Sequence, residues 1–170
     1  MILHAGLVAL RLGGYWRGAL IQGPSGAGKS DLALRCLDAG FQLVADDRVV
    51  IWASGGAVYG RPPAPLAGLI EARGQGVLTE SALPFCEIVL ALDLIVAGGE
   101  IERIPAPDVL TLAGMTLPLR RFDPFEASAP AKLRRALQHL GAARQQAYLA
   151  CASGGGDRLG TGGYFLRPLR

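Results

Sequence analysis

The chain has 170 residues, a length typical of one domain with a substantial buried core. Hydrophobic residues make up 51% of the chain and charged residues only 18%, which excludes an intrinsically disordered protein. The formal net charge of +3 comes from scattered arginines without a block of like charges, so nucleic acid is not an expected partner. No apolar run approaches the roughly 18 residues that span a bilayer, so we expect no membrane association either.

The cysteines and the start of the chain indicate the compartment. Cys36, Cys86 and Cys151 show no metal-binding or redox spacing, and Cys36 falls at a helical position where a small core residue fits. The apolar start is interrupted by His4 and Arg11 and is predicted to be a strand rather than a secretory leader. We therefore expect a cytoplasmic protein with reduced thiols.

Glycine turns divide the chain into strands and helices. Apolar, β-prone runs on either side of such turns predict three hairpins. They comprise residues 3–12 with 18–22, 49–53 with 57–59, and 109–120 around Ala113-Gly114. Single strands are expected at 41–45 and 87–96, the second turning at Gly98-Gly99 towards 101–104. Helices are expected from near Lys29 to Gly40 and from Pro130 into the run 131–150.

The balance of these elements sets the fold class. Strands outnumber helices, so we expect an α/β fold with a mixed sheet and hairpins rather than a strictly alternating doubly wound sheet. Residues 1–152 are expected to form a single domain, and the glycine-rich C-terminal tail, 153–170, is expected to be flexible.

The strongest local signal is the stretch GPSGAGKS, which follows a predicted strand and opens a predicted helix. It fits the phosphate-loop pattern G-x-x-x-x-G-K-[ST] at every position. Its residues are candidates for nucleotide binding: Gly23, Pro24, Ser25, Gly26, Ala27, Gly28, Lys29 and Ser30. Glycines without a Cβ let backbone N–H groups turn inward around phosphate oxygens, and the start of the following helix favours an anion.

The last two residues of this loop carry its specific chemistry. In this pattern the lysine, here Lys29, reaches the β- and γ-phosphates, and the hydroxyl of Ser30 holds Mg²⁺. The only other lysine is Lys132, and the remaining fifteen of the 17 basic residues are arginines. A lysine inside the loop therefore indicates a specific role, and we expect ATP and Mg²⁺ as ligands.

Two adjacent aspartates, Asp46 and Asp47, end the strand that follows the loop helix. Neighbouring strand residues point to opposite faces, so the two carboxylates are expected to have different roles. One is expected to face Mg²⁺ or the fold, and the other to accept a proton from an attacking hydroxyl. The residues alone do not decide between these assignments.

Together these stretches resemble the catalytic domain of bacterial HPr kinase/phosphorylase, a bifunctional serine kinase of the phosphotransferase system. GPSGAGKSDLALRCLDAGFQLVADDRV is similar to the family's loop, helix and aspartate pair at the same spacing. LIEARGQG, residues 69–76, matches a later signature of the family, and His4-Ala5-Gly6 matches in part a His-Gly near the start. The resemblance covers roughly residues 4 to 80. It implies a P-loop kinase domain of the HPr kinase / phosphoenolpyruvate-carboxykinase-like type.

The resemblance also implies roles for individual residues. Lys29 binds nucleotide phosphate, Ser30 and Glu71 are Mg²⁺ ligands, and Asp47 is the catalytic base. His4 is counted among the family's active residues, and residues 71–79 form a catalytic segment. Within this segment, the positive charge of Arg73 is expected to offset charge on the transferring group. The implied partner is an HPr-like phosphocarrier protein, and the implied assembly is a homo-oligomer, a hexamer. Read without the family, Glu71 and Arg73 are more simply a surface ion pair, and His4 is an ordinary hairpin residue.

The sequence departs from the family in its later part. The family has a P-V-x-P-G-R-N segment with a catalytic arginine, whereas this chain reads LPLRRFDPFEASAPAKLRRAL at that place and contains no asparagine. Arg120 and Arg121 are candidates to replace the arginine. The chain also starts at the catalytic domain, as in truncated proteobacterial forms. We therefore expect a kinase with weak phosphorylase activity.

Two other functions stay open at this point. A small-metabolite P-loop kinase would also explain the loop, although no arginine-bearing lid segment is evident. A non-catalytic nucleotide-sensing regulatory domain would bind nucleotide without transferring phosphate to a serine.

Overall fold

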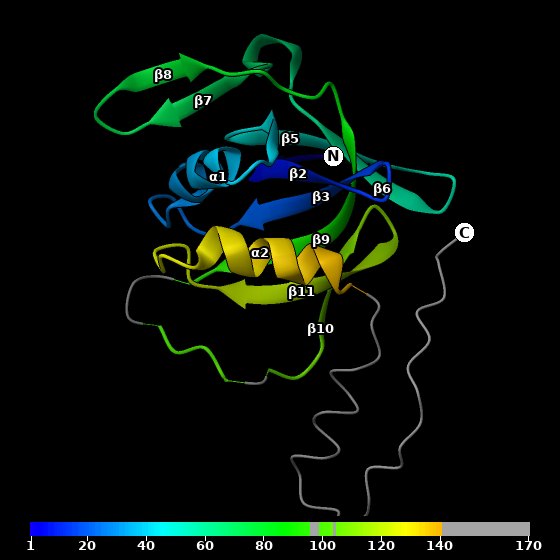
Figure 1. Cartoon of the computed structure of the whole chain (residues 1–170). Helices are drawn as coiled ribbons and strands as arrows, with labels where there is room; N and C mark the ends of the chain where they lie inside the picture. Colours follow the sequence, from blue (N-terminus) through cyan, green and yellow to red (C-terminus); the bar gives the residue numbers. More distant parts are fainter. Residues whose placement is uncertain (96–98, 104, 141–170) are drawn as a thin grey trace, which may run out of the picture. The chain divides into compact units, whose positions relative to one another are not determined.

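The structure, a computed structural model shown in Figure 1, describes residues 1–95, 99–103 and 105–140. Met1–Leu140 form one compact unit. Five predictions fall wholly or partly outside the described residues: the end of the strand 87–96, the turn at Gly98, the end of the continuation 101–104, the helical run beyond residue 140, and the tail 153–170 with the domain boundary before it.

The described residues form eleven strands, two α-helices and one 3₁₀ turn. Their bounds in chain order are β1 (Ile2–His4), β2 (Gly6–Leu12), β3 (Tyr15–Gln22), α1 (Lys29–Asp38), β4 (Gln42–Ala45), β5 (Arg48–Ser54), β6 (Ala57–Arg61), η1 (Ala64–Leu66), β7 (Leu69–Ala72), β8 (Gly76–Thr79), β9 (Cys86–Leu94), β10 (Asp108–Leu112), β11 (Met115–Phe122) and α2 (Ala129–Gln138). None of the helices among them is long and apolar enough to cross a bilayer.

Nine of the strands form a single mixed sheet. Its main path runs β1-β5-β6-β9-β3-β2-β4, and β11 joins it by pairing with β9 and with β10. β3 and β11 run parallel to β9, whereas the other pairs are antiparallel. The predicted mixed sheet with hairpins is therefore confirmed, and β7 and β8 form a separate two-stranded sheet.

All three predicted hairpins are present, with one shift in bounds. Gly13 and Gly14 both have positive φ (58° and 88°) and close a two-residue turn, so β3 begins at Tyr15 rather than at residue 18. A two-residue turn with left-handed backbone matches the twist of paired strands, which explains why pairing extends up to the glycines. The expected continuation at 101–104 is not a strand in its described residues, 101–103.

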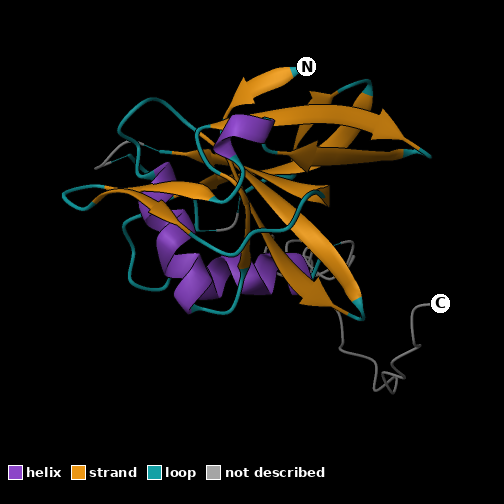
Figure 2. Ribbon diagram, turned by 90° about the horizontal axis from the view of Figure 1, so that it is seen from above, coloured by secondary structure: helices purple, strands orange, loops and turns teal. Residues whose placement is uncertain are grey.

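Alternation along β2 divides the interior into two apolar clusters. Leu7 and Ala9 pack on one side of the sheet with β5 and β6 residues, while Val8 and Leu10 pack on the other side with α1 and α2. Figures 1 and 2 show both helices on this second face. The sheet is thereby covered on both faces, and its strand ends are left to present side chains.

The loop helix α1 has the predicted bounds. Leu32, Ala33 and Cys36 follow the spacing of one helical face and are fully buried in the second cluster. Gly40, at φ 83°, ends the helix, and the N–H of Phe41 donates to the carbonyl of Cys36 at 3.0 Å. Helix and sheet together fix where the residues before and after α1 lie.

Cys36 and Cys86 are expected to resist alkylation by iodoacetamide while the protein is folded. Burial raises the pKa of each thiol from 9.0 to about 12, opposed at Cys36 by Arg35 and Arg134 and assisted at Cys86 by Glu87. Since the thiolate is the reactive form, neither thiol should react near neutral pH. Peptide mapping after alkylation measures this, with urea-unfolded protein as the positive control. Labelling of either cysteine at the unfolded rate would contradict the prediction.

The raised pKa values of the two thiols also make the free energy of unfolding depend on pH. The folded chain holds the two thiol protons more tightly than the unfolded chain does. Their contribution to the free energy of unfolding is therefore present below pH 9.0 and is lost as the pH rises towards about 12.

Candidate active site

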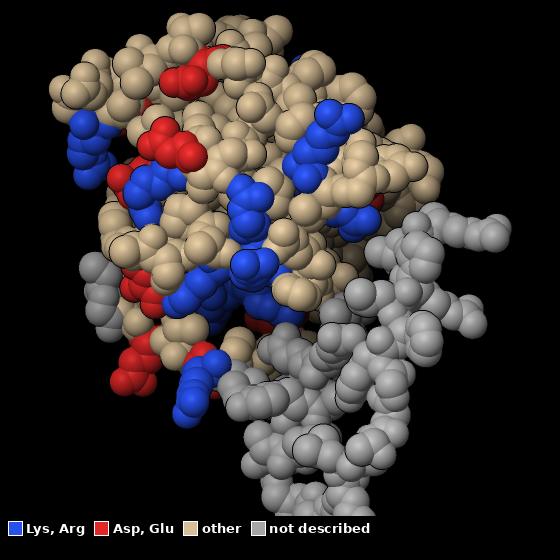
Figure 3. All heavy atoms as spheres, viewed as in Figure 1, with Lys and Arg blue, Asp and Glu red and all other residues tan. Residues whose placement is uncertain are grey.

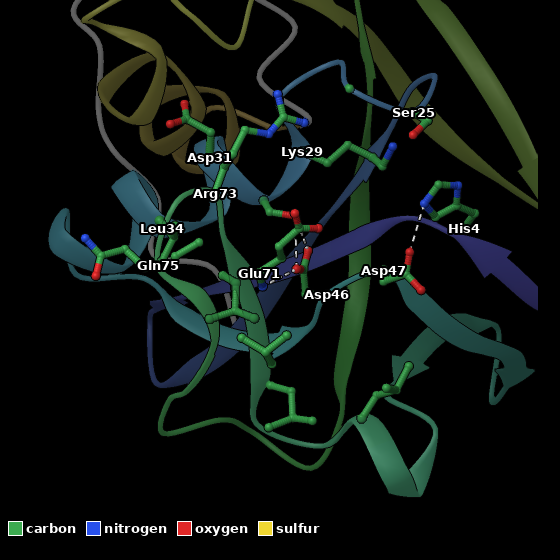
Figure 4. Close-up of a pocket in the computed structure, with 18 of the residues that line it drawn as sticks. His4, Ser25, Lys29, Asp31, Leu34, Asp46, Asp47, Glu71, Arg73 and Gln75 are labelled. Atoms are coloured by element: carbon green, nitrogen blue, oxygen red, sulfur yellow. Dashed lines mark hydrogen bonds and ion pairs between the residues drawn. The ribbon is translucent and has the colours of Figure 1, made fainter.

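The phosphate loop connects β3 to α1 and lies in a large cavity of about 840 Å³ (Figure 4). Gly26 and Gly28 have φ of 78° and 88°, values that residues with a Cβ rarely adopt. The N–H of Ala27 donates to the carbonyl of Pro24 at 3.2 Å and tightens the loop. The cavity is of the size that small-molecule ligands fill.

Lys29 is the first residue of α1 and is only 7% exposed. Its Nζ donates to the carbonyls of Gly23 at 3.0 Å and Pro24 at 2.9 Å. Within the described part of the chain, none of the ion pairs includes Lys29. Because carbonyl groups do not neutralise an ammonium, the positive charge of Lys29 is available to an anion in the loop.

Asp46 links three segments beside the loop. It is 6% exposed, and both of its carboxylate oxygens lie 3.0 Å from the Ser30 hydroxyl, which donates to them. The backbone N–H of Glu71 also donates to Asp46 Oδ2, at 3.0 Å. One buried carboxylate thus holds the loop helix and the β7–β8 hairpin together. One aspartate of the pair was expected to face Mg²⁺ or the fold, and Asp46 was not among the predicted site residues.

Asp47 differs from Asp46 in almost every respect. Its side chain is 58% exposed, and its φ of 64° places it in the left-handed region, which aspartate tolerates better than most residues. His4 Nε2 lies 3.0 Å from Asp47 Oδ1, and Arg48 Nε lies 3.4 Å from Asp47 Oδ2. Different environments for the two aspartates were predicted from strand alternation, but the strand already ends at Ala45. The left-handed turn at Asp47, rather than the pleat, separates the carboxylates.

His4 reaches Asp47 from a strand of its own. His4 was predicted to lie in the first strand of the first hairpin. In the structure, Ala5 separates β1 from β2, and β1 pairs with β5 instead. The register places His4 opposite Arg48, next to Asp47 in the chain. Figure 4 shows the imidazole pointing at the Asp47 carboxylate. The reading of His4 as an ordinary hairpin residue therefore does not fit its position.

Glu71 and Arg73 come from the β7–β8 hairpin and line the same cavity. The described ion pairs do not include one between them, so the surface ion-pair reading finds no support. In Figure 4 Arg73 extends from the hairpin into the cavity on the side of α1. On the face seen in Figure 3, basic side chains gather over α2, whereas acidic and basic side chains are mixed along the edge that carries α1 and the hairpin.

The oxygen donors beside the loop suit Mg²⁺. Mg²⁺ is usually held by one or two carboxylates together with substrate phosphates and waters, rather than by a closed protein cage. Ser30, Asp46 and Glu71 provide a hydroxyl and two carboxylates of this kind, whereas the described residues contain no cluster of three or more His, Cys, Asp or Glu side chains that would form a protein cage. The donor set therefore fits a cation shared with a bound phosphate.

Asp46→Ala is expected to lower the free energy of unfolding by about 1–3 kcal/mol, because it leaves the Ser30 hydroxyl and the Glu71 N–H without an acceptor. It should also raise the Mg²⁺ concentration needed for nucleotide binding. Urea denaturation measures the first effect, and Asp47→Asn is the control, since that carboxylate is exposed and asparagine also tolerates the left-handed backbone at this position. Equal losses of stability in the two variants would contradict the structural role of Asp46.

The fold and the site define a class of protein, in which a phosphate loop, its helix and an aspartate pair are carried by a mixed sheet with hairpins. Residues 3–86 match the family model of the HPr serine kinase C-terminal domain. Over these residues, just under half of the chain, it is similar to that family. The matched range includes His4, the loop, both aspartates and the β7–β8 hairpin.

Individual relatives match over part of their length. The HPr kinase/phosphorylase of Streptococcus thermophilus is 46% identical over 70 residues, 41% of this chain and 23% of that protein. The HPr kinase/phosphorylase of Clostridium perfringens is 43% identical over 81 residues, 48% of this chain and 25% of that protein. The chain thus spans about a quarter of the length of these relatives.

A solved structure agrees over more of the chain. The Hpr(Ser) kinase/phosphatase from Coxiella burnetii superposes on 90% of this chain and 97% of its own, with a TM-score of 0.69. At 21% sequence identity this likeness shows the fold, and it confirms the predicted α/β class of the HPr kinase type.

Proposed function

We propose that the chain is an ATP- and Mg²⁺-dependent serine kinase that phosphorylates HPr or a related phosphocarrier of the phosphotransferase system. The observation that carries the proposal is the placement of Asp47, with His4 at 3.0 Å, in the same cavity as the phosphate loop and Lys29. A proton acceptor and a phosphate cradle are the two parts that transfer from ATP to a hydroxyl requires.

The nucleotide phosphates are assigned to the loop. Its backbone and the N-terminus of α1 favour an anion, and the buried ammonium of Lys29 offsets charge on the β- and γ-phosphates. Ser30, Asp46 and Glu71 would hold Mg²⁺, which supplies further charge neutralisation when it is bound. Arg73, from the hairpin opposite, is assigned to the charge of the transferring group.

Asp47 is assigned as the base that takes the proton of the attacking serine. Its side chain is 58% exposed, so a hydroxyl on the surface of another protein can reach it. This exposure favours a protein substrate over a small metabolite, which an enzyme usually encloses in its pocket. Contacts with His4 and Arg48 orient the carboxylate. The proposal also includes a homo-oligomeric assembly, as the family resemblance implies, and a cytoplasmic location, as expected from the cysteine pattern.

Tracing the γ-phosphate of ATP tests the proposal against its alternatives. The protein is incubated with γ-³²P-labelled ATP, Mg²⁺, HPr from the same host and a cell extract of small metabolites. Label in the HPr band supports the serine kinase. Label in a small molecule other than ATP and inorganic phosphate would indicate a metabolite kinase, and ATP binding without transfer would indicate a nucleotide sensor.

The reverse reaction, phosphorolysis of phosphoserine by inorganic phosphate, is expected to be much slower than the forward one. It brings one anion up to another and so needs additional positive charge in the site. Arg120 and Arg121, the candidates for the family's later arginine, line a separate cavity of about 230 Å³ and not the cavity of the phosphate loop. Pyrophosphate release from phosphoserine-HPr and phosphate measures this rate, and comparable rates in both directions would contradict the expectation.

A further inference from the structure

An exposed aromatic side chain lies against the phosphate loop. Phe125 is 54% exposed and lines the same cavity as Ser25, Gly28 and Lys29. A Cβ placed on Gly28 would lie 2.9 Å from Phe125 Cζ and 3.1 Å from Cε1, so the ring touches the last glycine of the loop. None of the roles assigned above uses Phe125.

The backbone around Phe125 is fixed although its ring is exposed. The guanidinium of Arg35, on α1, donates to the carbonyls of Pro124 and Glu126, the residues on either side. The N–H of Phe125 itself donates to Asp123 Oδ1 at 2.9 Å. The backbone that carries the ring is thus held in place before a ligand arrives, and preorganisation of this kind favours binding.

The position of Phe125 in the sheet indicates which part of a ligand it meets. The phosphate loop follows β3, and Asp46 follows β4, two strands away on one side through β2. Phe125 follows β11, two strands away on the other side through β9. A nucleoside triphosphate that lies along this edge of the sheet with its γ-phosphate towards the aspartates extends its nucleoside end towards the β11 side.

We infer that Phe125 is the platform on which the base of the nucleotide stacks. The inference rests on the proposed nucleotide-binding function and adds the residue that binds the nucleoside end. Aromatic rings stack on the π-face of any base, so purine nucleotides should bind with similar affinities whatever their edge groups. The segment Asp123-Pro124-Phe125 stands where the family has its arginine segment. The inference assigns this segment a role in binding the nucleoside.

Two ligands that differ in the presence of the nucleoside provide the test. Calorimetry with Mg²⁺ compares ATP with inorganic tripolyphosphate, which has the phosphates but no nucleoside. Phe125→Ala is expected to weaken ATP binding about tenfold, the order of effect of removing one stacking aromatic, and to leave tripolyphosphate binding unchanged. Phe125→Tyr should restore ATP affinity. Phe85→Ala is the control, because Phe85 is 53% exposed but packs near Trp52 and Tyr59 instead of lining the cavity.

Each other outcome has a definite meaning. Equal weakening of both ligands by Phe125→Ala would overturn the inference, since Phe125 would then only support the loop. Unchanged ATP affinity in that variant would overturn it as well, and would leave the proposed kinase function standing. Wild-type protein that binds neither ligand would contradict the proposed function itself, and the inference with it.

Discussion

Lys29→Ala is expected to lower phosphate transfer from ATP by about a hundredfold or more. In the transition state, negative charge builds up on the transferring phosphoryl group and on the leaving phosphate. Lys29 is a buried ammonium whose described partners are two neutral carbonyls, so its charge is directed at the loop. Initial rates of HPr phosphorylation measure the loss.

The chain offers a matched control for this variant. Lys132 is the only other lysine, and it pairs with Glu126 at a half-exposed position on α2. Lys132→Ala should leave the transfer rate unchanged. Because Lys29 also ties the loop to Gly23 and Pro24, circular dichroism should accompany the assay to show that the variant is folded. Retention of more than about a tenth of the wild-type rate would contradict the assigned role, given the effect usual for one electrostatic group.

Asp47→Asn is expected to separate binding from chemistry. The amide keeps the shape of the side chain but cannot take a proton from serine, so nucleotide affinity should stay near normal. The transfer rate should fall by about a hundredfold or more, as for loss of a general base. Calorimetry with ATP and single-turnover transfer to HPr measure the two quantities separately.

Two comparison variants test whether the loss of transfer is specific to Asp47. Asp108→Asn changes an exposed aspartate outside the cavity and should affect neither quantity. Asp46→Asn should change metal dependence or stability first, because Asp46 is the acceptor for Ser30 and Glu71. Interchanged behaviour of the Asp46 and Asp47 variants would show that the roles within the pair are reversed, although the site itself would stand.

Local sequence patterns predicted the parts of this fold that depend on neighbouring residues. Glycine turns located the three hairpins, and helical spacing with Gly40 located α1, because backbone conformation decides these features. The mixed character of the sheet followed from the excess of strands. Strand order could not be predicted, since the pairing of β3 with β9 joins residues far apart in the chain.

In the site, too, local motifs could be predicted from the sequence, whereas contacts between distant segments could not. The loop and the aspartate pair were evident from their motifs, but the contact of His4 with Asp47 depends on the pairing of β1 with β5. The anchoring role of Asp46 depends on a hydrogen bond from Glu71 in a separate hairpin. Phe125 was missed because Asp-Pro-Phe has the composition of an ordinary turn, and only its contact with Gly28 gives it meaning.

Mapping of the transferred phosphate tests the central claim most directly. Wild-type protein and Asp47→Asn are incubated in parallel with ATP, Mg²⁺ and HPr, and fragmentation mass spectrometry identifies the modified residue. The account predicts phosphoserine on HPr with the wild-type protein and almost none with Asp47→Asn, at equal ATP occupancy. Unmodified HPr despite bound ATP, or phosphoserine formed equally by both proteins, would contradict it.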